Sequence, residues 1–295
     1  MKSTIKDEIT NKVIKDLEEL EATGSDLAPW VRGWRNDGTN SSLCLSPRNG
    51  ATQRPYSGIN WVILSMFSPF KSNEWFTENQ ASDLLDVDNP IPDGEEPTRI
   101  VFYKNLSRMD DKGEPIYTPY LKAYQVWNRE QIPGLPQVKN TSKFDPKSGI
   151  DEMLVNLKLK GGVHVGGDRA CYVPSEDAVC IPNDDAFDSP DEATSVKAHE
   201  GCHATGAEHR LKRKLSTKDE TAYAYEELIA ELGSAMVCAS LGIPLDKLRH
   251  TEYIGVWLKR LKNDKTYIFR AAADANKAMQ YLITSTTKKK WRKAA

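Results

Sequence analysis

Two histidines four residues apart, with a glutamate directly after the first, constrain this chain more than any other feature. They lie in the segment His199-Glu200-Gly201-Cys202-His203. In an α-helix, residues four apart project from one face, so both imidazoles can bind one metal ion with Glu200 beside it. Zinc hydrolases use such imidazoles to hold the ion and such a carboxylate to take a proton from water. The pattern therefore predicts a helical, hydrolase-type metal site.

The flanking residues carry signals for the two ends of this helix. Ser189-Pro190-Asp191-Glu192 has the features of a capping box, with a hydroxyl at the N-cap, proline at the first helical position and a carboxylate three residues on. Gly206 is a candidate for a left-handed C-cap. We therefore expect a helix from Ser189 to Gly206 that contains both histidines.

A catalytic zinc site commonly takes a third ligand from the protein. A second capping box, Thr217–Glu220, opens an apolar-periodic stretch that ends at Gly242 and predicts the next helix. Glu227 and Glu231 share a face of that helix, so we expect Glu227 to be the third ligand and Glu231 to orient a histidine. Glu226 points about 100° away from Glu227 and is the less favoured ligand.

A metal site of this kind assigns chemical roles to the residues around it. Glu200 would be the general base, and the ion would be Zn²⁺ or another divalent metal with the same ligand preference. A strand expected at Ala178–Ile181 could lie at the edge of the cleft and pair with an extended peptide. The candidates for oxyanion stabilisation, among which the sequence does not choose, are His164, Tyr172, His209, Tyr223 and Tyr225. The alternative interpretation is an exposed helix with two solvated histidines.

Length and composition limit the class of protein. The 295 residues are enough for two domains. No apolar run approaches the roughly 20 residues that span a bilayer, so no membrane partner is expected. The N-terminal segment predicts an amphipathic helix over about residues 5–22 rather than a signal peptide. The odd cysteine count and the lack of Cys-x-x-Cys spacing favour a reducing cytoplasm over a disulfide scaffold; the cysteines are Cys44, Cys171, Cys180, Cys202 and Cys238.

A turn-rich stretch near residues 131–150 divides the chain. We expect an α+β domain over residues 1–132, a linker over 133–149 and a second domain over 150–295. In the first domain, helices are expected near 61–65 and 78–83. Strands are expected at Thr98–Tyr103 and Leu121–Trp127, where β-branched and aromatic residues alternate with polar ones.

Aromatic residues and arginines alternate in the first part of this domain. Aromatic faces stack on unpaired bases and arginines bind phosphates, a combination that suits single-stranded nucleic acid. Trp61 and Trp127 are expected in the core instead. Acidic residues outnumber basic ones by 20 to 15 over residues 1–130, which argues against a broad phosphate-binding surface. The basic run Lys288–Lys293 is interpreted as a solvated tail.

Three blocks follow one another in the first half: Gln53–Trp61 with the pattern R-x-Y-x-G-I-N, Glu74–Ala81 with W-x-T-x-x-Q-A, and Tyr124–Gln131 with Y-x-V-W-N-x-x-Q. They resemble the N-terminal domain of ArdC-type antirestriction proteins, which also occurs in plasmid-transfer primases of the TraC type. After the turn-rich stretch, Tyr172–Pro182 and His199–Gly206 resemble the zincin-like half of the same family. The variable positions of the histidine motif are Gly201 and Cys202 rather than bulkier aliphatic residues.

The resemblance implies a domain that binds single-stranded DNA, followed by a zincin-like metallopeptidase domain. It also implies protection of incoming plasmid DNA from host restriction during conjugation. The expected DNA contacts come from the first two blocks and from two arginines before them: Arg54, Tyr56, Asn60, Trp75 and Phe76, with Arg32 and Arg35. Two functions stay open, namely occupancy of the strand or cleavage of a host protein by a DNA-targeted metallopeptidase. The intact Glu200 favours retained chemistry, and no protein substrate is evident.

Overall fold

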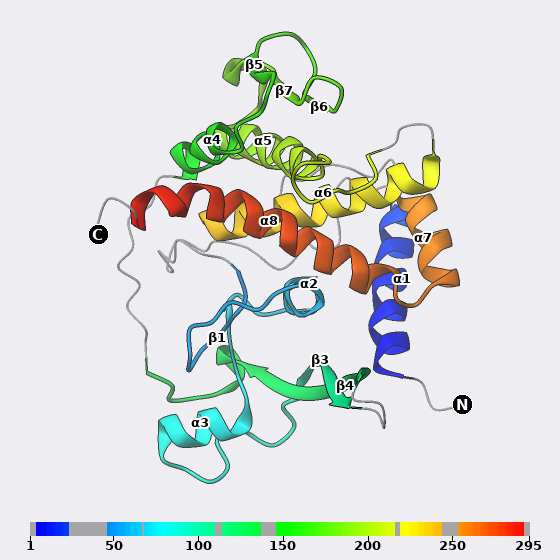
Figure 1. Ribbon diagram of the computed structural model, residues 1–295. Coiled ribbons are helices and arrows are strands. Elements are labelled where there is room, and N and C mark those ends of the chain that lie inside the picture. Colours follow the sequence, from blue (N-terminus) through cyan, green and yellow to red (C-terminus); the bar gives the residue numbers. More distant parts are fainter. Residues whose placement is uncertain are drawn as a thin grey trace.

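A computed structural model of the chain describes residues 4–23, 46–66, 68–109, 114–136, 146–215, 219–243 and 253–291. The structure mixes helices and sheets, as expected, in three layers (Figure 1). A layer of helices lies between a small three-stranded sheet and a four-stranded sheet. Among the helices described, none has the length and apolar character needed to cross a membrane.

The four-stranded sheet belongs to the N-terminal half and has the strand order β1-β2-β4-β3. Its strands are β1 (Arg48–Asn49), β2 (Glu74–Phe76), β3 (Thr98–Met109) and β4 (Pro115–Asn128). The antiparallel pair β3–β4 runs from Thr98 opposite Val126 to Met109 opposite Pro115, so both expected strands exist and are longer than expected. A 3-10 turn, Arg129–Gln131, follows β4, and α3 (Glu78–Leu85) follows β2.

Helix α2 (Ile59–Met66) joins the four-stranded sheet to the helical layer. Its Ile63 and Leu64 pack with Trp75 of the sheet. Its Trp61 and Val62, in contrast, belong to the large apolar cluster of the helical layer. Because a helix presents different residues on opposite sides, this short segment contributes to two cores at once.

The N-terminal helix α1 (Ile5–Thr23), expected at about 5–22, packs against the C-terminal half of the chain. Val13 and Leu17 lie in one apolar cluster with Trp257 of α7 (Ile254–Asn263). The Thr10 hydroxyl donates to the backbone carbonyl of Lys265 at 2.9 Å. Figure 1 shows α1 and α7 side by side, although they come from opposite ends of the sequence.

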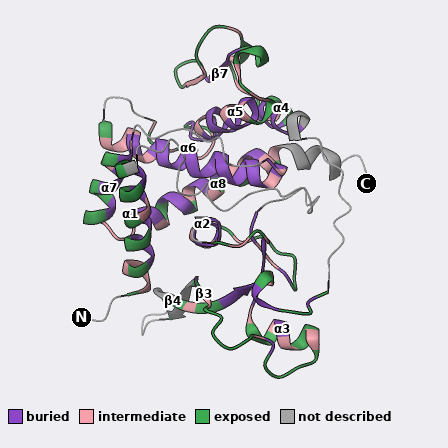
Figure 2. Cartoon of the chain, turned by 180° about the vertical axis from the view of Figure 1, so that it is seen from behind, coloured by how far each residue is buried: buried purple, intermediate pink, exposed green. Residues whose placement is uncertain are grey.

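The helical layer also contains α4 (Pro146–Asn156), α5 (Pro190–Thr205), α6 (Glu220–Leu241) and α8 (Tyr267–Trp291). Helix α4 begins inside the stretch expected as a linker. Most residues of α6 and of α5 are buried (Figure 2).

Small residues allow these helices to approach closely. A Cβ atom on Gly201 would lie 3.1 Å from Leu154 of α4 and 3.3 Å from Leu282 of α8, while one on Gly233 of α6 would lie 2.7 Å from the Cys202 sulfur. The close packing explains why the variable positions of the histidine motif are Gly201 and Cys202.

The N-caps of α5 and α6 differ in part from the expectation. Ser189 caps α5 by accepting from the Glu192 backbone N–H at 3.2 Å, but the Glu192 carboxylate accepts from the N–H of Asp188 rather than from that of Ser189. The N-cap of α6 is Asp219, which accepts from the Ala222 N–H at 3.1 Å. The expected cap, Thr217, lies outside the described residues.

The two glycines expected at helix ends behave differently. Gly242 has φ 76° and ends α6 as expected. Gly206 has φ −74° and is not left-handed. A side chain there would be crowded, because a Cβ atom would lie 2.8 Å from Leu215 and 3.0 Å from Arg213 as the chain folds back on the end of α5.

The three-stranded sheet covers α4 and α5 and has the strand order β5-β7-β6. Its strands are β5 (Gly162–Val165), β6 (Cys171–Val173) and β7 (Ala178–Ile181), and a 3-10 turn, Asp184–Ala186, follows. Strand β7 is central and is paired on both sides, so the expectation that it forms the cleft edge is wrong. The backbone N–H and C=O groups of β7 are hydrogen-bonded to β5 on one side and to β6 on the other. The edge strands of this sheet are therefore β5 and β6.

Candidate metal centre

Three side chains from α5 and α6 converge on one point. The Nε2 atoms of His199 and His203 are 3.0 Å apart. Glu227 places one carboxylate oxygen 3.4 Å from Nε2 of His199 and the other 3.5 Å from Nε2 of His203. One donor atom from each residue lies within 4.8 Å of the others, which makes this a group able to hold a metal ion. The i, i+4 spacing on α5 brings the imidazoles together, and the packing of α6 on α5 adds the carboxylate.

A second pair of carboxylates lies on the other side of the two imidazoles. Glu231 approaches Nδ1 of His199 at 3.3 Å, and Glu226 approaches Nδ1 of His203 at 3.2 Å. Each ring is therefore held at both nitrogens, with Nε2 toward Glu227. A carboxylate on Nδ1 fixes the orientation of a metal-binding imidazole and makes its other nitrogen a better ligand. We expected this position for Glu231 and did not expect it for Glu226.

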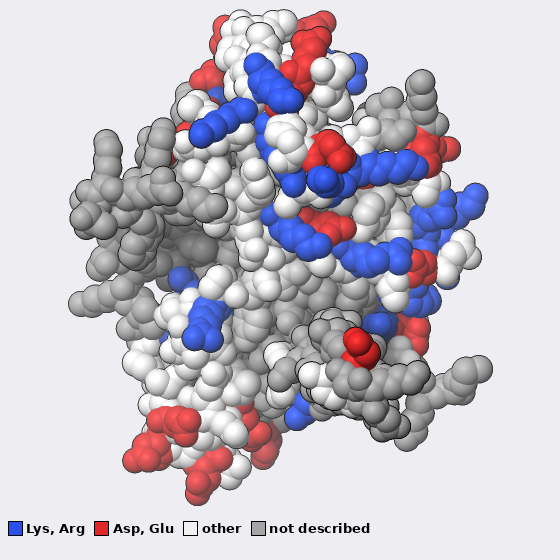
Figure 3. Space-filling model, viewed as in Figure 1, with Lys and Arg blue, Asp and Glu red and all other residues white. Residues whose placement is uncertain are grey.

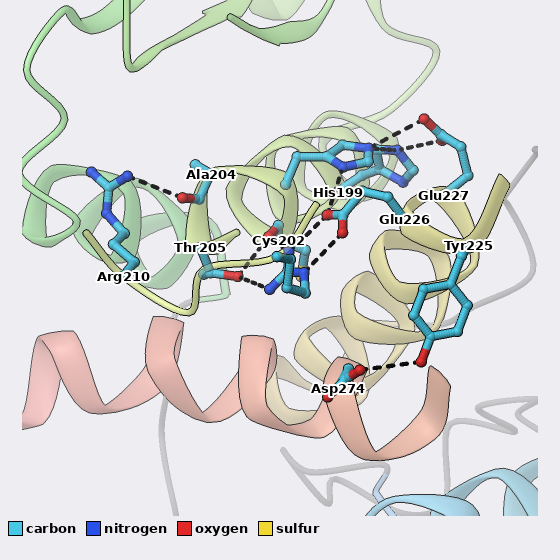
Figure 4. A network of polar contacts seen from close by, with 11 residues as sticks. His199, Cys202, Ala204, Thr205, Arg210, Tyr225, Glu226, Glu227 and Asp274 are labelled. Carbon is cyan, nitrogen blue, oxygen red and sulfur yellow. Dashed lines mark hydrogen bonds and ion pairs between the residues drawn. The ribbon is translucent and has the colours of Figure 1, made fainter. Parts of the chain in front are cut away.

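Arg213 holds Glu226 in place. Its guanidinium donates two hydrogen bonds to the Glu226 carboxylate, at 2.9 and 2.8 Å. It also donates to the Thr205 hydroxyl at 2.9 Å and to the Cys202 carbonyl at 2.7 Å, at the end of α5 (Figure 4). No periodicity in the sequence points to Arg213, because it reaches the site through the turn that follows α5.

Burial and hydrogen bonding set the charge of the site. Burial by itself lowers the pKa of both histidines, but hydrogen bonds to carboxylates outweigh it. They hold the pKa of His199 well above its usual value and raise the pKa of His203 to about 9. Burial raises the pKa of Glu227, but its hydrogen bonds to the two histidines bring it far below the usual value. In the absence of a metal, the surrounding carboxylates therefore favour binding of protons by the imidazoles.

Glu200, the expected general base, is buried on α5 next to His199. Burial is the main cause of the raised pKa of Cys171 on β6, the neighbouring Cys180 is the next, and the charge of Glu200 adds to both. The same charge also contributes to the raised pKa of His199. The Glu200 carboxylate thus lies within electrostatic range of both the histidine cluster and edge strand β6.

The structure separates the five oxyanion candidates. Tyr172 donates to Asp177 at 2.9 Å, and His209 lies 3.4 Å from the same carboxylate, which is also bound by Arg210. Tyr225 donates to Asp274 of α8 at 3.1 Å (Figure 4). His164 lies on β5 and is exposed.

Tyr223 is the candidate that borders the cluster. It precedes Glu227 by one helical turn, and its ring packs edge-on against Tyr253 with centroids 5.5 Å apart. Burial, the charge of Glu227 and hydrogen bonding to Tyr253 and Glu227 together raise the pKa of the Tyr223 phenol.

The residues expected to contact DNA do not form one exposed surface. Trp75 and Phe76 are 0% and 1% exposed, so the expectation that their rings stack on bases is corrected by their position in the core. Tyr56 is half-buried, and burial raises its pKa. Arg54 is exposed. The remaining two, Arg32 and Arg35, lie outside the described residues.

Asn60 has a structural contact instead. Its side-chain amide donates to the carbonyl of Val101 at 2.8 Å and accepts from the N–H of the same residue at 2.9 Å. Val101 lies on β3, which is an edge strand in the sheet that the described residues form. Asn60 therefore pairs with a free sheet edge in the way that another strand would.

The fold and the cluster together define a zincin-like metallopeptidase domain attached to an α+β region. A model of the family described as zincin-like metallopeptidase matches residues 150–274. The model of the N-terminal domain of anti-restriction factor ArdC matches residues 3–127. The chain belongs to the ArdC-type antirestriction family, which confirms the resemblance found in its sequence.

Two solved structures of the antirestriction ArdC protein from plasmid R388 are similar over almost the whole chain. The metal-free structure is 29% identical in sequence, with a TM-score of 0.75. The match covers 97% of this chain and 99% of the R388 protein. The Mn(II)-bound structure is 30% identical in sequence, with a TM-score of 0.73. The match covers 96% of this chain and 98% of the R388 protein.

Curated relatives differ in length. Two proteins from Escherichia coli named DNA primase TraC are each 32% identical over 91% and 90% of this chain, which spans 19% and 26% of their lengths. The uncharacterized protein y4eC of Sinorhizobium fredii is 31% identical over 94% of this chain and 91% of its own length.

Proposed function

We propose that this chain binds single-stranded DNA and protects incoming conjugative plasmid DNA from host restriction. The observation that carries the proposal is the similarity to R388 ArdC over 96% of this chain, including both halves. In this proposal residues 1–132 are the DNA-binding half and residues 150–295 the metallopeptidase half. Because α1 packs against α7, we expect DNA binding to be a property of the whole chain and test it there.

Charge restricts where DNA can bind. Acidic side chains gather over α3 and the segment after it, at the lower left of Figure 3. The exposed ones are Glu78, Asp83, Asp86, Asp88, Asp93, Glu95 and Glu96. These charges repel phosphates, so we place the strand away from α3.

The donor set fits a divalent ion. His199, His203 and Glu227 would hold Zn²⁺ or Mn²⁺, since imidazole and carboxylate suit both ions. A bound ion of this kind polarises carbonyl groups and acidifies water. Glu200 would accept a proton from the attacking water and return it to the leaving amine. Tyr223 is our choice for stabilising the developing oxyanion, and the free edge of β6 is our choice for pairing with an extended peptide.

A second function, cleavage of a host protein by a DNA-targeted metallopeptidase, is favoured by one observation. Glu200 is kept beside the cluster and near an edge strand, whereas a purely structural metal site needs no general base. The two functions differ in whether protection requires Glu200.

The decisive experiment is conjugative transfer of a plasmid into a restricting host. We compare the wild-type chain with Glu200→Ala and with the control Glu208→Ala, an exposed glutamate at the end of the same region. Protection by strand occupancy predicts that Glu200→Ala still protects. Loss of protection by Glu200→Ala, with normal expression, metal content and DNA affinity, establishes proteolysis instead. A wild-type chain that binds no single-stranded DNA in a gel shift contradicts the main proposal.

A further inference from the structure

We propose that Phe102 and Tyr124, together with Lys122, form the surface on which the bases of a single DNA strand stack. This inference rests on the proposed DNA-binding function and names the residues that would carry it. None of the three belongs to the set expected from the sequence. They lie on the β3–β4 pair of the N-terminal sheet, toward the end where Thr98 is opposite Val126.

The three side chains occupy one face of the sheet. Phe102 is opposite Lys122, and Ile100 is opposite Tyr124, so Phe102 and Tyr124 are diagonal neighbours across the two strands. Their rings meet edge-on with centroids 6.2 Å apart. The Lys122 ammonium lies 4.8 Å from the centre of the Tyr124 ring. Two aromatic rings and one positive charge are thus presented together.

Among the side chains that the structure describes in this half, these two aromatic rings are the accessible ones. Phe102 is 48% exposed and Tyr124 is 40% exposed. Among the described side chains of residues 4–136, every other aromatic ring is buried or half-buried, namely Tyr56, Trp61, Phe70, Trp75, Phe76 and Trp127. A base can stack only on a ring face that solvent reaches, and of the rings described in residues 4–136 this pair meets that condition.

The backbone beneath the pair is held firmly. The Asn60 amide makes two hydrogen bonds to Val101, the residue directly before Phe102. On the same face as the two rings, Ile100 and Val126 are buried in the core. The strands at this point are therefore anchored at the sheet edge by Asn60 and on the ring-bearing face by the neighbouring core residues. A rigid platform loses little conformational freedom when a ligand binds, which favours stacking.

The chemistry of the pair selects a single strand over a duplex. In a duplex the faces of the bases are already stacked on one another, whereas a single strand offers them to an aromatic ring. Stacking does not depend on which base is present, so low sequence specificity follows. Lys122 adds one positive charge for a phosphate, which makes the affinity depend on salt.

The binding test uses the full-length chain and a fluorescent oligothymidylate strand. Phe102→Leu and Tyr124→Leu remove the aromatic face and keep an apolar side chain, whereas Phe102→Tyr and Tyr124→Phe keep the ring. Each leucine variant should bind about tenfold more weakly, and each ring-keeping variant should bind like the wild type. Val165→Ala, which trims an apolar residue 69% exposed on β5, is the control and should have no effect.

A second measurement needs no variant. A strand containing 5-iodouracil forms a covalent link, on irradiation, to an aromatic ring stacked against it. Peptide mass mapping of the wild-type chain should find the link at Phe102 or Tyr124.

The outcomes separate the two proposals. A wild-type chain without affinity for single strands overturns the proposed function and this inference with it. Wild-type affinity that survives in both leucine variants, or links found at other residues alone, overturns the stacking surface and leaves the proposed function standing. Equal weakening by leucine and by the ring-keeping variants also overturns it, because the ring would then be unnecessary.

Discussion

The Glu226 carboxylate lies 3.2 Å from Nδ1 of His203, on the side of the imidazole opposite Glu227. Glu231 stands in the same relationship to His199, at 3.3 Å. Both rings are consequently oriented before any ion binds, with their Nε2 atoms turned toward a shared carboxylate. Glu227 would therefore contact an ion directly, whereas Glu226 and Glu231 would act on it through the histidines. Substitutions in the two groups should affect metal binding differently.

The first prediction concerns metal content. The purified wild-type chain should carry about one divalent ion, and His199→Ala, His203→Ala or Glu227→Ala should lose it, because each change deletes a donor atom. Glu200→Ala should keep the ion, since this carboxylate serves as a base rather than as a ligand. Elemental analysis by mass spectrometry measures both. Full occupancy in Glu227→Ala, with an empty site in Glu226→Ala or Glu231→Ala, contradicts the assignment.

The second prediction concerns Arg213. Arg213→Met removes both hydrogen bonds to Glu226, so His203 loses its fixed orientation without losing a metal donor. The affinity for the ion should fall by about tenfold to a hundredfold while one site remains. Competition with a chelator measures the change. Lys212→Met is the matched control, because Lys212 is exposed and pairs with exposed Glu208. Equal affinity in the wild type and Arg213→Met shows that Arg213 does not position the site.

The third prediction concerns pH. The folded pKa of His203, about 9, lies above the usual 6.5, so its ion pairs stabilise the metal-free fold below pH 6.5. That stability is lost as the pH rises through about 9, and the free energy of unfolding of the metal-free protein should fall over this range. Denaturant titrations across the range measure it. A metal-loaded sample should lack this decline, because the ion takes the place of the protons.

A linked measurement follows from the same charges. At pH 7 metal binding should release protons, since a histidine must be neutral to be a ligand. Calorimetry in two buffers with different ionisation enthalpies detects the release. Identical apparent enthalpies in the two buffers show that the imidazoles are already neutral.

The fourth prediction concerns the thiols. Burial raises the pKa of Cys202 far above its usual value and that of Cys238 to about 12, and both side chains are covered. Cys171 and Cys180 are half-exposed, so an alkylating reagent reaches both, although burial also raises the pKa of Cys171. Iodoacetamide should therefore label Cys171 and Cys180 in the native protein, and Cys202 and Cys238 only after denaturation. Peptide mass mapping distinguishes them. Rapid native labelling of Cys202 indicates that α5 and α6 separate in solution.

The parts of the candidate site that depend on residues close together in the sequence could be predicted from it. The i, i+4 spacing of His199 and His203, the hydroxyl cap at Ser189 and the left-handed glycine at Gly242 are local properties, and they are readable from the chain. The expected position of Glu231 near a histidine also agrees with the structure, because helical periodicity limits which carboxylates share a face with Glu227.

Long-range packing decided the rest. Arg213 reaches Glu226 through a turn with no repeating pattern, and β7 is central rather than an edge because β5 and β6 pair with its two sides. Trp75 and Phe102 are both aromatic residues on strands of one sheet, yet the first is fully covered and the second is 48% exposed. A sequence records that a residue is aromatic and which strand face it shares. Whether that face is covered depends on which distant segments pack against it, and only the tertiary structure determines this.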